Sequence, residues 1–246
     1  MLTALPENTW RGTSLGHFLK ELKFRMPKET FLQLKREKRE HILRTAAKVL
    51  AERGFARTDV AGIARQAGVA KGSLYNYFAN KEDLYLHVCR DGMQRSHQAV
   101  YGQLDDEKSI FDQIDHIFRN GFAFAQTHPE YIRLYLNVAS AGMERFAEEL
   151  TLEVEKFTAD YLKKLIENGI RDGCVRTDID VNMTAFLINN LYVMLLVSLV
   201  SRHFQIRLNE YLKTDNQGGA VSAKEALAMV IGLIHDLLRP RLDKRP

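Results

Sequence analysis

The sequence predicts an all-α protein. Apolar residues recur at three- and four-residue spacing over most of the chain after residue 30, which is the period of one face of a helix. Helix-ending signals such as Gly54-Phe55 and His128-Pro129 separate these stretches. The sequence offers no convincing β-hairpin or strand–helix–strand pattern and no internal repeat. We therefore expect a fold made only of packed helices.

Composition limits the class of protein. The chain has 246 residues, 46% of them hydrophobic, which is enough for a core in one large or two modest domains. Its two cysteines, Cys89 and Cys174, are far apart without CxxC spacing, which argues against a disulfide framework or a zinc site and fits a reducing compartment. Residues such as Pro6, Glu7 and Arg11 interrupt any apolar run near the start. We expect no signal peptide and a cytoplasmic location.

The first long helix is expected from Phe31 to Arg53. Its apolar stripe consists of Ile42, Leu43, Ala46, Ala47, Val49 and Leu50. Gly54 should end it, because glycine adopts the left-handed backbone of a helix stop without strain. Thr58 is expected to cap the following helix through its hydroxyl, at an end whose backbone N–H groups could face a DNA phosphate.

Two short helices joined by a tight turn are expected between residues 58 and 78. The first buries Val60, Ile63, Ala64 and Ala67, and Gly68 makes the turn. In the second, Leu74 and Phe78 lie four apart and anchor one face. The other residues should point outward: Lys71, Gly72, Ser73, Tyr75, Asn76 and Tyr77. A short helix with this polar surface is typical of the second helix of a helix-turn-helix, which enters the DNA major groove.

A fourth helix should begin after Asn80 and run to about Tyr101. Asn80 and Asp83 form an approximate capping box, and Lys81 lies beside unpaired backbone N–H groups, where it could bind a phosphate. Residues 28–90 contain 13 Lys and Arg against 7 Asp and Glu. That basic excess lies on and just before the helix-turn-helix, where phosphate contacts would be made.

At these positions the chain resembles the TetR family of bacterial transcriptional regulators. The resemblance rests on Gly54-Phe55, Thr58, Val60-x-x-Ile63-Ala64 and the run from Ala67 through Phe78, completed by residues 80–84. It covers roughly residues 35 to 90, and Ala70 departs from it where the family often has a capping serine. It implies that Tyr75 and Tyr77 contact the DNA backbone or a thymine methyl group, and that the chain forms a dimer with an effector cavity in its C-terminal domain.

The remainder is expected to be helical. The predicted helices span 110–126, 131–141, 144–168, 181–211 and about 223–238. A polar break at residues 105–108 separates them from the fourth helix. We therefore expect an N-terminal extension at 1–30, either disordered or a short helix, then a helix-turn-helix DNA-binding domain at 31–95. A helical effector-binding and dimerisation domain would occupy 96–246.

The stretch from Thr184 to Ser201 carries no charge over 18 residues. Asn189, Asn190 and Ser198 interrupt it, so a membrane span is the weaker interpretation. A helix covered on all sides fits better, with one face in its own domain and another against a partner. Together with the apolar last helix it could form a four-helix interface in a homodimer. The alternative is that both helices belong to the core of a monomer.

Polar-tipped residues on the apolar helices are candidates for an effector pocket. These are Tyr131, Tyr135, Asn137, Tyr192 and His203. Each could equally be a satisfied core residue. The histidines do not cluster at metal-ligand spacing, and no catalytic constellation is supported, so we expect no metal, no cofactor and no enzymatic activity.

The sequence therefore predicts a homodimeric, DNA-binding transcriptional regulator. We expect a repressor that a small molecule releases from an inverted-repeat operator in double-stranded DNA. One alternative is a DNA-bound scaffold that recruits a protein partner without a small ligand. Another is a membrane-associated helical protein.

Overall fold

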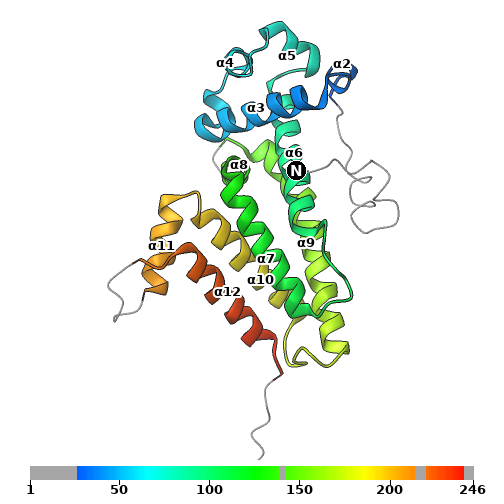
Figure 1. Ribbon diagram of the computed structural model, residues 1–246, viewed down its shortest axis with the longest axis vertical. Helices are drawn as coiled ribbons and strands as arrows, with labels where there is room; N and C mark the ends of the chain where they lie inside the picture. Colours follow the sequence, from blue (N-terminus) through cyan, green and yellow to red (C-terminus); the bar gives the residue numbers. More distant parts are fainter. Residues whose placement is uncertain (1–26, 139–141, 214–219, 241–246) are drawn as a thin grey trace, which may run out of the picture.

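The computed structural model describes residues 27–138, 142–213 and 220–240 (Figure 1). Within these ranges the regular structure is helical and includes no strand, so the all-α prediction is confirmed. The helices are α2 (Glu29–Leu32), α3 (Arg36–Arg57), α4 (Val60–Gln66), α5 (Lys71–Tyr77), α6 (Lys81–Tyr101), α7 (Ile110–Thr127), α8 (Pro129–Val138), α9 (Glu144–Arg171), α10 (Val181–Ser198), α11 (Arg202–Leu212) and α12 (Ala223–Leu238).

The helices form two groups that share α6. Helices α2, α3, α4 and α5 lie together at one end of the molecule, and α7 to α12 make up the rest (Figure 1). Helix α6 begins beneath α3 and runs into the second group, where it packs against α7, α8 and α9. Helix α8 packs against both α3 and α6, so it joins the two groups a second time.

The core follows the predicted apolar stripes. All six stripe residues of α3 are buried, and Ile42 and Ala46 are fully so. In the second group the buried apolar residues of α7, α9, α10 and α12 meet at a common centre, which includes Phe118, Ile166 and Ile188. Burial of side chains this large supplies most of the free energy that offsets the ordering of the chain.

The predicted first helix is divided in the structure. A short α2 ends at Leu32 and α3 starts at Arg36, because Phe31 turns inward to lie 4.9 Å from Phe78 between ring centres. Gly54 has a positive φ of 72° and interrupts the helical backbone as predicted, although the following residues complete one more turn to Arg57.

The predicted helix 181–211 is also divided, which corrects that expectation. Helix α10 ends at Ser198 and α11 starts at Arg202. The Ser198 hydroxyl donates to the Leu195 carbonyl at 2.6 Å, and Ser201 adopts an extended backbone between the two helices. Serine hydroxyls compete for helical carbonyls in this way, but neither a glycine nor a proline signals the break.

Among the described helices, α10 is the one that is long and apolar enough to cross a bilayer by length and composition, and 39% of its residues are buried within the protein.

The remaining predicted helix boundaries agree with the structure within a few residues. Pro129 starts α8, and Ser222 caps α12 in a full capping box with Glu225. Residues 1–26 of the expected N-terminal extension lie outside the described residues. Residues 139–141, the last three of the helix predicted to end at Ala141, also lie outside them.

Candidate functional site

Helix α4 and the turn after it have helix-turn-helix geometry. The buried face of α4 is the predicted set Val60, Ile63, Ala64 and Ala67. Gly68 has a φ of +64°, and the Val69 N–H donates to the Ala64 carbonyl at 3.0 Å. These two features make a Schellman ending, which turns the chain sharply into α5.

Helix α5 buries its two predicted anchors and shows a polar surface on the other side. Leu74 and Phe78 are 1% and 2% exposed. The exposed residues of the helix are Lys71, Gly72, Tyr75 and Asn76, and Ser73 is half-buried. The surface of α5 therefore carries a cation, an amide, a phenol and a hydroxyl around a glycine to which a DNA backbone could approach closely.

Tyr77 does not belong to that surface, which corrects the prediction that it points outward. It is only 8% exposed, and its ring centre lies 5.6 Å from that of Phe31. The physical reason is helical periodicity, because position 77 follows Leu74 by three residues and therefore shares its buried face.

Thr58 is not the cap of α4, which corrects a second prediction. Its hydroxyl donates to the Gly54 carbonyl at 2.8 Å, and the residue is 3% exposed. The cap is Asp59, whose carboxylate accepts the Gly62 N–H at 2.7 Å. That hydrogen bond lowers the pKa of Asp59. Threonine and aspartate are adjacent and both are good caps, so the sequence alone could not separate them.

Residues just before α3 hold the C-terminal end of α5. The Lys28 backbone N–H donates to the Tyr77 carbonyl at 2.9 Å, and Lys28 Nζ donates to the Tyr75 carbonyl at 2.7 Å. The Thr30 hydroxyl donates to the Asn76 carbonyl at 2.5 Å. These three bonds satisfy the last carbonyl groups of a seven-residue helix. We call Lys28 and Thr30 the α2 clasp. Sequence reasoning placed both residues in an extension and missed this role.

The start of α6 has the predicted cap. Asn80 accepts the Asp83 N–H at 2.8 Å, while the Asp83 carboxylate accepts the Ala79 N–H rather than that of Asn80. Lys81 is the first residue of the helix, as expected. Its Nζ lies 4.4 Å from the centre of the Phe55 ring and 3.4 Å from the Ala56 carbonyl oxygen. These contacts hold the ammonium group against the C-terminal end of α3.

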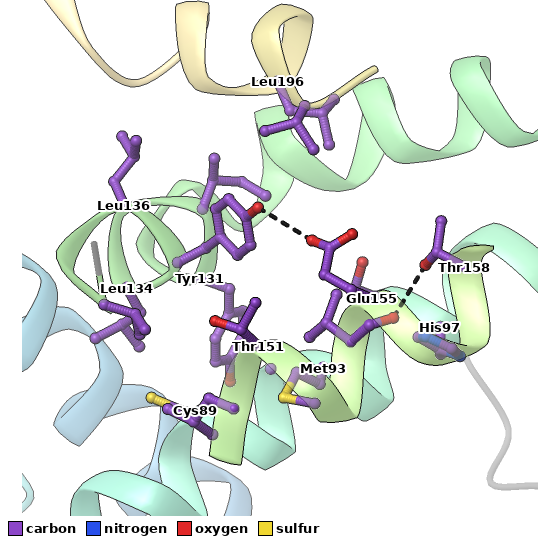
Figure 2. A pocket seen from close by; sticks show the side chains of 18 of the residues that line it. Cys89, Met93, His97, Tyr131, Leu134, Leu136, Thr151, Glu155, Thr158 and Leu196 are labelled. Atoms are coloured by element: carbon purple, nitrogen blue, oxygen red, sulfur yellow. Dashed lines mark hydrogen bonds between the residues drawn. The ribbon is translucent and has the colours of Figure 1, made fainter. Parts of the chain in front are cut away.

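A cavity of about 410 Å³ lies among α6, α7, α8, α9 and α10 (Figure 2). Its wall is mainly apolar, with Met93, Val100, Leu134 and Leu196 among the residues that line it. The volume lies in the range of small-molecule pockets. An apolar wall with a few polar groups is the usual lining of such pockets.

Three of the five predicted effector residues line this cavity. These are Tyr131, Tyr135 and Tyr192. Burial, together with the charge of Glu155, raises the pKa of Tyr135 to about 12, so its hydroxyl keeps its proton at neutral pH.

Asn137 and His203, the other two predicted residues, are not among the described residues that line the cavity. Asn137 Nδ2 donates to the Leu50 carbonyl of α3 at 3.5 Å, on the other side of α8. His203 is exposed on α11, beyond the break that ends α10. Helical spacing alone does not show which face of a helix meets the cavity.

Sequence reasoning missed Glu155, the carboxylate of the cavity. Glu155 Oε2 accepts Asn189 Nδ2 at 2.9 Å, and its Oε1 accepts the Tyr135 hydroxyl at 3.4 Å. Figure 2 shows its carboxyl group pointing into the space between Thr151 and Leu196. A glutamate on an amphipathic helix was the available signal, but the sequence of α9 contains several acidic residues, and spacing alone does not separate Glu155 from the others.

Contacts connect the cavity wall to the helix-turn-helix end. The Tyr131 hydroxyl donates to Asp91 Oδ2 at 2.7 Å, and Arg95 pairs with the same oxygen at 2.8 Å. Near the start of α9, the Phe146 ring lies 5.1 Å from that of Phe55. Helices α8 and α9 of the cavity wall therefore contact α6 and α3 directly.

Helices α10, α11 and α12 leave large apolar side chains uncovered. They are Met183, Phe186 and Leu187 on α10, Ile206 and Tyr211 on α11, and Met229 and Leu233 on α12. Phe186 is 62% exposed and Leu233 is 56% exposed. Helix α10 packs against both α11 and α12, so these exposed side chains lie on helices that are in contact with one another.

Comparison with known proteins agrees with this geometry. The family profile described as bacterial regulatory proteins, tetR family, matches residues 42–88, from α3 into α6. The HTH-type transcriptional repressor KstR2 of Rhodococcus jostii is 31% identical over 156 residues, which are 59% of this chain and 72% of the relative. The fatty acid metabolism regulator protein of Bacillus subtilis is 26% identical over 158 residues, 64% of this chain and 80% of the relative.

Solved structures show the same fold. FadR from Bacillus subtilis, in complex with stearoyl-CoA, aligns with a TM-score of 0.64 at 19% identity, covering 80% of this chain and 98% of that one. A TetR family regulator from Chloroflexus aurantiacus aligns with a TM-score of 0.63 at 23% identity, covering 88% and 100%. Taken with the helix-turn-helix of α4 and α5, these findings establish that the chain belongs to the TetR family of DNA-binding transcriptional regulators.

Proposed function

We propose that this protein is a homodimeric repressor that binds an inverted-repeat operator through α5 and leaves it when a small molecule fills the cavity. The observation that carries the proposal is the polar surface of α5, which is exposed while Leu74 and Phe78 anchor the helix from below. We propose a DNA-binding domain that reaches to about Arg95 and includes the α2 clasp, followed by an effector-binding and dimerisation domain.

The proposed DNA contacts are the exposed groups on and beside α5. Lys71 would approach a phosphate or a base edge. Gly72 has no side chain, and no protein atom lies within 4 Å of where its Cβ would be, so the DNA backbone could come close to the backbone of α5 at this position. Ser73 and Asn76 would donate or accept in the major groove, and Tyr75 would contact the backbone or a thymine methyl group. Lys81 would contact a phosphate. Buried Thr58 and Tyr77 are left out of this set.

The apolar faces of α10 and α12 support pairing with a second copy. Phe186 and Leu233 are more than half exposed in the single chain, and burial of such side chains in a two-fold interface stabilises a dimer. Two copies of α5 held about one helical turn of DNA apart would reach successive major grooves on one face of the duplex. An inverted repeat is the sequence that fits this symmetry.

The cavity supports regulation by a small molecule. FadR of Bacillus subtilis is described with stearoyl-CoA, and AibR, which aligns with a TM-score of 0.60, with isovaleryl coenzyme A and operator DNA. The cavity of this chain could likewise take a ligand with an apolar body. A ligand that favours one position of α8 and α9 would shift α3 and α6 only through its difference in affinity for the two states.

Selection from a random library of duplex DNA tests the proposal. We expect enrichment of an inverted repeat, bound by two copies of the chain as measured by sedimentation or mass photometry. A protein with no preference for any duplex sequence would contradict it. A protein that binds an operator but responds to no small molecule and instead retains a partner protein would favour the scaffold function.

A further inference from the structure

The charge inventory of the cavity is one-sided. Among the described residues that line it, Glu155 is the only acidic residue and there is no lysine or arginine. His97 also lines it, but burial lowers the pKa of this imidazole to about 4, so it is neutral at pH 7. The described lining of the cavity therefore carries one acidic group and no positive charge to balance it.

The neighbours of Glu155 leave part of its carboxylate available. Asn189 donates to one oxygen and Tyr135 donates weakly to the other, at 3.4 Å. A carboxylate offers about four acceptor positions, so two donors do not saturate it. None of the ion pairs among the described residues involves Glu155. The group is held in place by neutral donors and can still accept from a ligand.

Aromatic rings surround the same space. Tyr101, Tyr135 and Tyr192 line it together with Phe124. The faces of such rings attract cations, most strongly where water is excluded. A carboxylate among aromatic rings provides both interactions that an organic cation needs, whereas a ligand carboxylate would be brought close to a like charge.

We propose that the ligand of this cavity is an apolar molecule with a protonated amine, and that Glu155 accepts hydrogen bonds from that amine. The inference rests on the proposed function, because it takes the cavity to be the effector site. Since the donors from Asn189 and Tyr135 fix the carboxylate, the amine end of the ligand would lie near α9 and α10. Its apolar body would extend toward Met93 and Leu134.

Three probes of nearly equal shape test the ligand class. They are 4-phenylbutylamine, 4-phenylbutanol and 4-phenylbutanoate, each titrated into the full-length protein by calorimetry at pH 7. A hydrogen bond to a charged group contributes about 1.5–3 kcal/mol, so the amine should bind roughly ten- to hundredfold more tightly than the alcohol. The carboxylate should bind more weakly than either.

The variant Glu155→Gln should remove the advantage of the amine over the alcohol. Glu148→Gln is the matched control, since it makes the same charge change at an exposed position of the same helix, and it should leave the ratio unchanged. The inference is overturned if the carboxylate binds as tightly as the amine, if Glu155→Gln keeps the ratio, or if none of the three probes binds.

Fluorescence anisotropy of operator DNA in the same samples separates this inference from the proposed function. An amine that binds through Glu155 without releasing DNA supports the ligand class and contradicts the effector role. DNA that is released by the carboxylate and not by the amine contradicts the ligand class and supports the effector role.

Discussion

The α2 clasp makes a quantitative prediction about DNA affinity. Replacing Thr30 by valine keeps the shape of the side chain but removes the hydroxyl that donates to the Asn76 carbonyl at 2.5 Å. Thr30 is exposed, so water can take over the bond, and the loss is the net value of one hydrogen bond, about 1 kcal/mol. A helix of seven residues is not stable alone, so α5 depends on such bonds and on its two anchors.

A loss of about 1 kcal/mol corresponds to a factor of about five in an equilibrium constant. We therefore expect Thr30→Val to weaken operator binding by up to about fivefold in a fluorescence anisotropy titration. Amide hydrogen exchange in α5 should become faster by a similar factor. Thr30→Ser, which restores the hydroxyl, should behave like the wild type. If Thr30→Val changed neither affinity nor exchange, the clasp would have no role in holding α5.

Three further predictions concern other parts of the molecule. Lys81→Ala should weaken binding to all DNA sequences and lower the salt slope by about 1. Lys108→Ala, in the exposed loop between α6 and α7, should change neither. Opposite responses of specific and non-specific DNA would contradict a phosphate contact. Phe186→Glu should convert the dimer to a monomer in sedimentation. Leu152→Glu, at an equally exposed position on α9, should leave the dimer intact. If both variants remained dimeric, the interface would lie elsewhere. Burial lowers the pKa of His97 from 6.5 to about 4 in the folded state. Between these pH values only the unfolded state takes up the proton on His97. The free energy of unfolding should therefore fall by up to about 3 kcal/mol as the pH drops from 6.5 to 4. Urea denaturation of His97→Gln should lack this contribution, and an unchanged pH dependence would refute it.

Much of the fold could be predicted because its signals are local. Helix caps and stops at Gly54, Gly68, Asn80 and Ser222 depend on a few adjacent residues, and all four are where the sequence indicated. The break between α10 and α11 has no glycine or proline, and Ser201 simply adopts an extended backbone. Breaks of that kind depend on tertiary packing, which periodicity does not contain.

The candidate site was predicted less completely, for related reasons. The exposed face of α5 follows from the three- and four-residue spacing of a helix. The same spacing places Tyr77 on the buried face with Leu74, so Tyr77 should have been left out of the exposed set. The α2 clasp joins Lys28 to Tyr75 and Thr30 to Asn76, pairs that are separated by 47 and 46 positions in the sequence. A single sequence gives no pairing signal over such a separation. Glu155 was missed because its role depends on which helices surround it. Asn137 is not in the cavity lining because its face of α8 turns toward α3.

The central claim is that the exposed face of α5 reads the sequence of a DNA groove. It is tested most directly by repeating the selection from random duplex DNA with Asn76→Ala, alongside the wild type and Lys81→Ala. We expect Asn76→Ala to relax or change the preference at one position in each half of the inverted repeat, with Lys81→Ala retaining the wild-type consensus at lower affinity. An identical consensus for all three proteins, with only a uniform loss of affinity in Asn76→Ala, would contradict base reading by α5.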